Sequence, residues 1–290
     1  MYKIERKELV NTIKEMFIDS TYHLSSSMID ALKKAKNNES NQLGKNILSK
    51  IIENQEIAKE KDVPLCQDTG TAVVFLEIGR ELFFDYDLEE AIQSGVRMGY
   101  LDGYLRKSIV KHPLSRINTM DNTPAIVHYD FIDGHQLIIH AAPKGGGAEN
   151  MSRLTMLTPG EGEQGVIDFV LETVKLAGGK ACPPLIVGVG IGGNFETCAI
   201  LAKKAILRKL DDHAIIQKDF ELEEKLLPLI NQLNVGPMGL GGTTTALAVK
   251  VNSYPCHIAS LPVAVNLQCH SARKSEVILN GNKIINTHSL

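Results

Sequence analysis

The sequence predicts an α+β fold in which a helical N-terminal region packs on a mixed and antiparallel β-rich core. Three observations support this class: apolar residues recur at helical spacing through the first 60 residues, the last third is rich in short β-branched segments, and helices and strands are partly segregated along the chain. The 290 residues contain no low-complexity linker. We therefore expect a single domain over residues 1–290.

The N-terminal region predicts helices at residues 8–17, 27–35 and 41–61, because each segment has an apolar face. Residues 71–79, TAVVFLEIG, predict the first strand, since β-branched residues dominate them. These elements form the start of the predicted fold.

A further helix is predicted over residues 87–110. Asp87 can cap its N-terminus, and the helix should end before the His112–Pro113 pair, because a proline disfavours helical backbone in the residue before it. Arg106 would then lie near the helix C-terminus, where a surface cation is the default interpretation. Its planar guanidinium also suits carboxylate binding, and the pattern does not decide between these roles.

Two β-hairpins are predicted. Residues 125–132 and 136–143 flank Asp133-Gly134, a typical hairpin turn, and residues 277–285 contain a second such pattern around Gly281. Helices are predicted at residues 161–179, 194–210 and 221–233, the last interrupted by Pro228, and strands at 185–191, 243–251 and 256–267.

Composition excludes several functional classes. The chain is 43% hydrophobic and 22% charged, and its formal net charge of −3 favours neither nucleic acid nor a membrane surface. No segment has the roughly 18 apolar residues of a membrane helix, and the N-terminus has no secretory signal. We expect a cytoplasmic protein, and the odd number of widely spaced cysteines indicates reduced thiols.

Three glycine-rich loops are candidate ligand-binding sites. Residues 188–196, GVGIGGNFE, lack the spacing of a dinucleotide-binding fingerprint, so tight strand-to-helix packing is at least as good an interpretation. Residues 144–150, KGGGAEN, and 236–245, GPMGLGGTTT, could let backbone approach a ligand closely or could be plain flexible loops.

The cysteines differ in context. Cys198 lies on an apparent apolar helix face, where a core role is the simplest interpretation, and Cys256 begins a strand and could serve either role. Cys66, Cys182 and Cys269 all lie at turn-like junctions, from which loops can converge in a fold. Their spacing matches no compact zinc or ferredoxin pattern, so a three-cysteine metal site is one hypothesis.

Three thiolates rather than four would have a chemical consequence. An iron–sulfur cube held by three cysteines leaves one iron open to bind substrate oxygen as a Lewis acid. Gln67 and Asp68 could then orient substrate, and His257 could handle protons. Alternatively, Asp68 is a turn cap and His257 an ordinary strand histidine.

These segments together resemble the class I, iron–sulfur-dependent fumarate hydratase and L-tartrate dehydratase family. The resemblance lies in PLCQDTG, GGGAENMS, KACPPLIVGVGIGGNFE, GLGGTTTALAVKV and CHIASLPVAVNLQCHSAR, and it extends over essentially the whole chain. In two-subunit members, this region corresponds to the alpha subunit. The resemblance therefore implies a beta subunit on a separate chain. The expected assembly is a hetero-oligomer or a dimer of alpha subunits.

The resemblance also implies site residues. Cys66, Cys182 and Cys269 would hold a [4Fe–4S] cluster. Substrate would be bound by Gln67, Arg106 and the Gly146 backbone, and the catalytic residues in this chain would be Asp68 and His257. The family's catalytic base belongs to the beta part, so none is assigned here.

The resulting hypothesis is that the protein catalyses the reversible hydration of fumarate to L-malate, so its substrate is a small dicarboxylate. Dehydration of L-tartrate to oxaloacetate is the alternative within the family. A non-catalytic iron–sulfur or redox-sensing protein, or a plain zinc protein, is an alternative from another class.

Overall fold

The computed structural model describes residues 1–283, so the last two residues of the predicted 277–285 hairpin lie outside it. The chain divides into two compact units. Of the described residues, the first unit comprises 1–23, 61–144 and 273–283, and the second comprises 24–60 and 145–272. Helices and mixed sheets occur in both units, which confirms the α+β class. That residues 1–290 act as a single domain stays a prediction.

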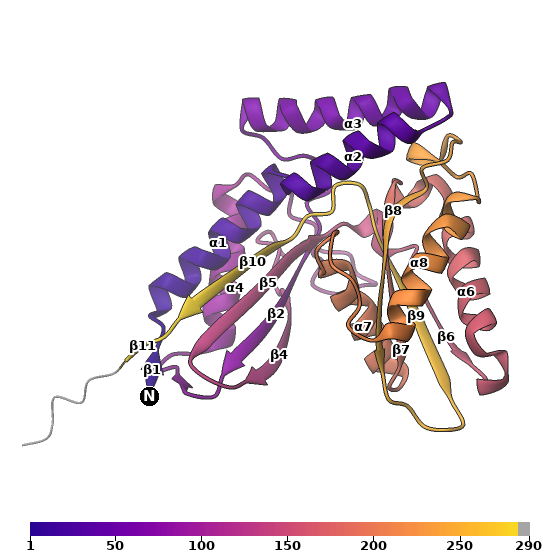
Figure 1. The fold of residues 1–290 in the computed structure, drawn as a ribbon. Coiled ribbons are helices and arrows are strands. Elements are labelled where there is room, and N and C mark those ends of the chain that lie inside the picture. Colours follow the sequence, from indigo (N-terminus) through magenta and orange to yellow (C-terminus); the bar gives the residue numbers. More distant parts are fainter. Residues whose placement is uncertain (284–290) are drawn as a thin grey trace, which may run out of the picture. The chain divides into compact units, whose positions relative to one another are not determined.

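The first unit is built on a four-stranded sheet of order β10-β5-β2-β4, in which β2 pairs antiparallel with β5 and parallel with β4. Helices α1 and α4 pack against each other beside this sheet (Figure 1). A small second sheet has the order β11-β1-β3. The elements are β1 (Tyr2–Lys3), α1 (Arg6–Tyr22), β2 (Thr71–Gly79), β3 (Leu82–Phe83), α4 (Leu88–Asp102), β4 (Ile126–Ile132), β5 (Gln136–Lys144), β10 (Ser275–Asn280) and β11 (Asn282–Lys283).

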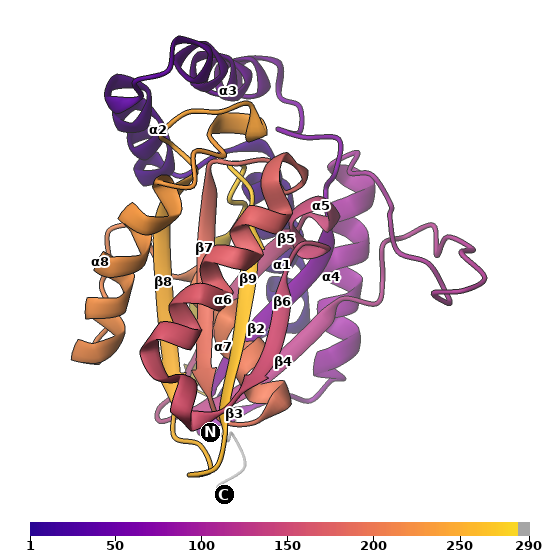
Figure 2. The same ribbon diagram turned by 90° about the vertical axis from the view of Figure 1, so that its right-hand side faces the viewer.

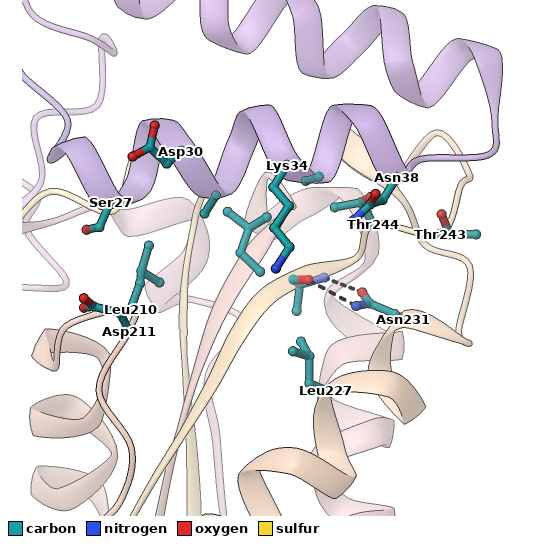
Figure 3. Close-up of a pocket in the computed structure, with 14 residues that line it drawn as sticks. Ser27, Asp30, Lys34, Asn38, Leu210, Asp211, Leu227, Asn231, Thr243 and Thr244 are labelled. Atoms are coloured by element: carbon teal, nitrogen blue, oxygen red, sulfur yellow. Dashed lines mark hydrogen bonds between the residues drawn. The ribbon is translucent and has the colours of Figure 1, made fainter.

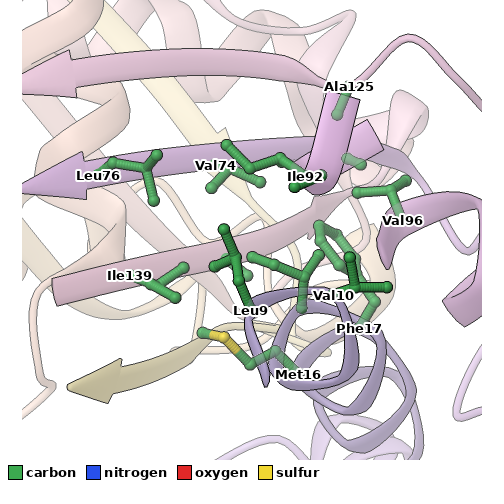
Figure 4. Packing of buried hydrophobic residues seen from close by; sticks show 14 of the residues in the cluster. Leu9, Val10, Met16, Phe17, Val74, Leu76, Ile92, Val96, Ala125 and Ile139 are labelled. Carbon is green, nitrogen blue, oxygen red and sulfur yellow. The ribbon is translucent and has the colours of Figure 1, made fainter. Parts of the chain in front are cut away.

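The core of the first unit forms between the two helices and the sheet. Leu9 and Phe17 of α1, Ile92 of α4 and Val74 and Ile139 of the sheet are among its fully or almost fully buried members (Figure 4). Each such side chain contributes about 1.5–3 kcal/mol when it leaves water. The predicted helix at residues 8–17 and strand at 71–79 are therefore confirmed, and their apolar residues form one core.

Helix α4 confirms the predicted cap but not the predicted end. The Asp87 side chain accepts a hydrogen bond from the Glu90 N–H at 3.0 Å. The helix stops at Asp102, well before residue 110. Gly103 closes the last turn, and Tyr104 follows with a left-handed φ of 50°. Because the left-handed residue ends the helical path, Arg106 lies in a loop, and its predicted place on a helix is wrong.

Neither predicted hairpin forms. β4 and β5 are joined by a short turn, but β2 lies between them in the sheet. Gly79 makes this possible, since a Cβ there would lie only 2.4 Å from the Gly134 carbonyl oxygen in that turn. At the other predicted hairpin, β10 pairs with β5 whereas β11 pairs with β1. Both errors arise because a strand from elsewhere in the chain takes the expected partner's place.

The second unit is built on a sheet of order β6-β9-β7-β8, with β7 parallel to β8 and antiparallel to β9. Helices α6, α7 and α8 lie against this sheet (Figure 2). Residues of α6 and α8 share the larger core with the sheet, and α7 packs on β7 and β9 through Cys198 and Ala202. The elements are α2 (Ser26–Asn38), α3 (Gln42–Lys61), α5 (Gly146–Glu149), β6 (Arg153–Leu157), α6 (Gly162–Ala177), β7 (Leu185–Gly192), α7 (Phe195–Leu207), α8 (Gln217–Asn231), β8 (Ala246–Tyr254) and β9 (Leu261–Gln268).

The glycines of β7 allow close helix packing. A Cβ on Gly190 would lie 2.0 Å from the Cys198 carbonyl oxygen in α7, and one on Gly188 would lie 2.4 Å from that of Ala202. The packing interpretation of residues 188–196 is thus confirmed, and so is the core role of Cys198, which is fully buried. Pro228 lies inside α8 without interrupting it, contrary to the prediction.

Within residues 1–283, no helix combines the length and the apolar character that crossing a bilayer requires.

Candidate functional site

The PLCQDTG segment forms a tight loop that leads directly into β2. The Cys66 thiol lies 3.4 Å from Gln67 Oε1, and the Gly70 N–H donates to Asp68 Oδ1 at 3.1 Å. Gly70 has a left-handed φ of 76°, and a Cβ there would lie 2.6 Å from the Lys144 backbone. The glycine therefore allows the turn that presents the thiol, amide and carboxylate together just before the start of β2.

Buried side chains hold this loop by its carbonyl groups. The Tyr100 hydroxyl donates to the carbonyls of Thr69 at 2.7 Å and Gly70 at 3.0 Å, and Asn122 Nδ2 donates to Gly70 at 3.1 Å. Arg273 Nη1 donates to the carbonyl of Asp68. Burial raises the pKa of Tyr100, so its hydroxyl stays protonated and remains a donor. The loop is thus a rigid platform rather than a flexible connection.

Arg106 belongs to the same group of residues. The Thr69 hydroxyl donates to the Arg106 carbonyl at 2.7 Å, which brings the loop after α4 beside the QDTG turn. The Arg106 side chain is exposed. The first unit therefore brings together Cys66, Gln67, Asp68 and Arg106, four of the predicted site residues. The Arg106 guanidinium is of a kind that can bind a carboxylate group.

The second unit brings together two of the predicted cysteines. Cys182 lies in a left-handed turn before β7, and Cys269 directly follows β9. The His270 N–H donates to the Cys182 carbonyl at 3.2 Å, and His270 Nδ1 lies 3.0 Å from the same oxygen. Because β7 and β9 are antiparallel, the start of one and the end of the other share one edge of the sheet.

Gly146 lies near this pair. It begins the one-turn helix α5, where a Cβ on Gly147 would lie 3.4 Å from the carbonyl oxygen of Lys180 in the turn before Cys182. The last residue of α5, Glu149, is anchored by two contacts. It forms an ion pair with Lys203 of α7 and accepts a hydrogen bond from Asn266 Nδ2 at 2.9 Å. Residues 144–150 are therefore ordered, which argues against a plain flexible loop.

His257 lies elsewhere in the second unit. It is exposed in the loop between β8 and β9, where its Nδ1 accepts a hydrogen bond from the Ala259 N–H at 3.1 Å. The eight residues of β9 separate this loop from Cys269, a span of roughly 26 Å at the usual rise of a strand. The structure therefore does not bring His257 to Cys182 and Cys269 within the second unit.

The loop at residues 236–245 holds a carboxylate of the chain itself. Glu39, at the junction of α2 and α3, accepts hydrogen bonds from the Thr243 N–H at 2.9 Å, the Thr243 hydroxyl at 3.0 Å, the Thr244 N–H at 2.8 Å and the Asn41 N–H at 3.0 Å. Burial acts to raise the pKa of Glu39, but these donors outweigh it and lower the pKa to about 2.

This loop also contacts the turn that presents Cys182. The Met238 N–H donates to the Pro183 carbonyl at 2.8 Å, and a Cβ on Gly239 would lie 2.3 Å from the Cα of Gly179. The glycines of this loop thus permit a close approach, but to the chain's own backbone and carboxylate. The sequence could not reveal this partner, because Glu39 lies some two hundred residues away.

A separate cavity of about 590 Å³ lies beneath α2. Lys34 points into it toward Asn231, which exchanges hydrogen bonds of 2.9 and 3.2 Å with the backbone of Ala246 (Figure 3). Among the described residues, its lining includes none of the predicted site residues. Lys34 and the acidic Asp30 and Asp211 along the wall are exposed, so no single charge dominates the cavity.

The donor set suits an iron–sulfur cluster. Cys66, Cys182 and Cys269 are partly exposed and form no disulfide, whereas the buried Cys198 has a thiol pKa raised by its burial. In residues 1–283, no group of three or more His, Cys, Asp or Glu side chains is gathered as a ready-made single-ion site. Cys182 and Cys269 lie on neighbouring turns of the second unit, and Cys66 lies on a loop of the first. Thiolates are the ligands that iron–sulfur clusters take.

Two residues of the site were missed by sequence reasoning. His270 and Arg273 both lie in the CHSAR segment, where one bonds the Cys182 carbonyl and the other the Asp68 carbonyl. Their position just after the predicted ligand Cys269 was the one feature of the sequence that could have pointed to them. Both act on backbone carbonyl groups, which side-chain patterns do not reveal.

Comparison with known proteins gives matches over almost the whole chain. Residues 10–278 match the family model Fumerase, described as fumarate hydratase (Fumerase). The putative L(+)-tartrate dehydratase subunit alpha of Methanocaldococcus jannaschii is 42% identical over 275 residues, covering 92% of this chain and 96% of that protein. The L(+)-tartrate dehydratase subunit alpha of Escherichia coli (strain K12) is 31% identical over 290 residues, covering 97% and 95%.

Proposed function

The chain belongs to the fumarate hydratase (Fumerase) family, and from this membership we propose that it is the alpha subunit of a hydro-lyase acting on a four-carbon dicarboxylate. Two observations support the proposal: His270, the residue after Cys269, bonds the Cys182 carbonyl, and Cys66 lies on a loop that also presents Gln67 and Asp68. These are residue types that a cluster-dependent hydration site requires.

L(+)-tartrate is the substrate that we place first. The relatives at 42% and 31% identity are named L(+)-tartrate dehydratase subunit alpha, which reverses the order that the sequence analysis gave. In this reaction a C–O and a C–H bond break, water leaves, and the resulting enol becomes oxaloacetate. Fumarate remains the second candidate, because the matching family model is described as fumarate hydratase.

The thiols of Cys66, Cys182 and Cys269 would hold a [4Fe–4S] cluster. When bound, such a cluster supplies a Lewis-acidic iron for a substrate oxygen. All three cysteines are partly exposed and none of them forms a disulfide, which supports their assignment as ligands.

Side chains of the first unit bind and orient the substrate. The exposed Arg106 guanidinium binds a carboxylate, the Gln67 amide hydrogen-bonds the substrate, and the Gly146 backbone of the second unit adds a further contact. The Asp68 carboxylate, oriented by the Gly70 N–H, handles a proton. That His257 handles protons in the same site stays a prediction, since in its own unit it lies far from the two cysteines.

A second subunit completes the enzyme in this proposal. The relatives are named subunit alpha, and this chain offers no assigned catalytic base. A beta-type chain would supply the base and further carboxylate-binding groups. A non-catalytic iron–sulfur protein, the alternative from another class, would bind a cluster but turn over no dicarboxylate with any partner.

Single serine substitutions test the ligand assignment. Cys66→Ser, Cys182→Ser and Cys269→Ser should each abolish the visible absorption of the cluster and lower the iron and sulfide content after anaerobic reconstitution. Cys256→Ser, at an exposed thiol outside the site, should leave both unchanged. Intact spectra in all three site variants would refute the assignment.

A further inference from the structure

Residues 104–120, which we call the arm, project from the first unit between α4 and β4 (Figure 2). Four large apolar side chains on the arm are strongly exposed: Tyr104 at 88%, Leu114 at 87%, Met120 at 75% and Ile117 at 60%. Scattered apolar residues are normal on a surface, but a gathering on one short segment marks an interaction site.

The arm also carries a strong local charge. It contains four basic residues, Arg106, Lys107, Lys111 and Arg116, and no aspartate or glutamate. The whole chain, by contrast, has 31 basic and 34 acidic residues. A positive, apolar segment on a slightly negative protein is complementary to an acidic surface with apolar pockets.

The arm is ordered without a partner. Its two sides pair like a short hairpin, with the Lys111 N–H donating to Ile117 O at 2.7 Å and the Thr119 N–H to Ile109 O at 2.9 Å. Asn118 Nδ2 closes the base by donating to Lys107 O at 3.0 Å. An ordered element loses little conformational entropy when it binds, so it is suited to docking.

The base of the arm is joined to the candidate site. The buried Asn122 accepts hydrogen bonds from the N–H groups of Ser108 at 2.6 Å and Ile109 at 3.2 Å, and its Nδ2 donates to the Gly70 carbonyl. Arg106, the first basic residue of the arm, is held beside the QDTG loop by Thr69. A chain bound to the arm therefore lies next to this part of the site.

We propose that the arm is the docking surface for the second, beta-type subunit, which meets it with an acidic surface and apolar pockets. The inference rests on the proposed function. A beta-type chain is the favoured occupant because the relatives are named subunit alpha, this chain has no assigned base, and the arm contains Arg106, whose carbonyl is bonded by Thr69 of the QDTG loop. Nucleic acid is disfavoured, since the exposed side chains that gather here are largely aliphatic and the chain is negative overall.

Binding between the full chain and the purified beta-type chain tests the proposal. Leu114→Glu and Ile117→Glu should each weaken the complex by at least about thirtyfold, as expected for central apolar contacts. Ile215→Glu changes a fully exposed isoleucine of the second unit and should leave the affinity unchanged. Lys111→Glu with Arg116→Glu should weaken binding most at low salt, because exposed charges are screened as salt rises.

Hydrogen exchange of the unaltered chain gives a measurement that does not depend on variant folding. Amides of residues 109–119 should become protected when the beta-type chain is added. Unchanged affinity in the arm variants, or no protection of the arm in a complex that does form, would overturn the docking proposal but not the proposed alpha-subunit function. Failure of the unaltered chains to associate would instead overturn the proposed alpha-subunit function. Self-association of this chain through the arm, or a nucleic-acid complex lost in the variants, would assign the arm to another occupant.

Discussion

Glu39 shows how a single carboxylate can organise a glycine-rich loop. Gly241 and Gly242 have φ values of 85° and 125°, which few other residues adopt. Thr244 is buried, so without an acceptor its N–H group would be left unpaired away from water, at a cost of about 1–3 kcal/mol. The carboxylate therefore stabilises the loop that contacts the Cys182 turn.

Glu39→Gln should lower the free energy of unfolding by about 2–3 kcal/mol at pH 6. The pKa of Glu39 is lowered from 4.5 to about 2, so its stabilisation is complete above about pH 4.5 and is lost as the pH falls towards 2. Urea unfolding at pH 6 and pH 3 should therefore show the gap between variant and wild type narrowing at the lower pH. Glu56→Gln, at an exposed position in α3, is the control, and equal stability of wild type and Glu39→Gln at pH 6 would contradict the account.

Residue patterns suggested candidate site residues but not the side chains that support them. That PLCQDTG, CHSAR and GGGAEN carry site residues stays a prediction, whereas Cys198 lies in the core as expected. The anchors Tyr100, Asn122 and Arg273 could not be predicted, since each reaches a backbone carbonyl far along the chain. Such contacts have no local signature in the sequence.

At the scale of elements, β7 and α7 depend on glycine for their spacing. A Cβ on Gly190 would come within 2.5 Å of the Ala202 nitrogen as well as the Cys198 oxygen. Both atoms belong to helix backbone, which cannot move by a side-chain rotation. β7 also begins just after Cys182, so this packing helps to position the cysteine turn.

Gly190→Ala should therefore destabilise the fold by about 2–3 kcal/mol, the usual cost of overpacking a core. Thermal and urea unfolding would measure the loss. Gly160→Ala is the matched control, because a Cβ there meets nothing within 4 Å. If both variants unfold like wild type, the close contact is not a constraint on this packing.

Local patterns predicted most elements but not all of their partners. Helical spacing correctly placed α1, α2 and α3, and β-branched content placed β2. The turn at Asp133-Gly134 does join two strands, yet β2 separates them. Turn chemistry specifies a reversal of the chain, whereas pairing depends on which strand the whole sheet accommodates.

At the scale of the whole molecule, the predicted ligands are divided between the two units. Cys66 belongs to the first, and Cys182 and Cys269 belong to the second. Segments from both ends of the chain build the first unit, which no domain boundary in the sequence indicated. The prediction that these residues act together rests on the family resemblance, which extends over both units.

The central claim is that this chain is the alpha subunit of a cluster-dependent hydro-lyase. Its most direct test is anaerobic co-expression with the beta-type chain, followed by turnover assays on L(+)-tartrate, fumarate and L-malate. We predict formation of oxaloacetate from L(+)-tartrate, lost in Cys66→Ser, Cys182→Ser and Cys269→Ser. A reconstituted complex that turns over none of the three acids, or one that keeps its activity in all three variants, would contradict the account.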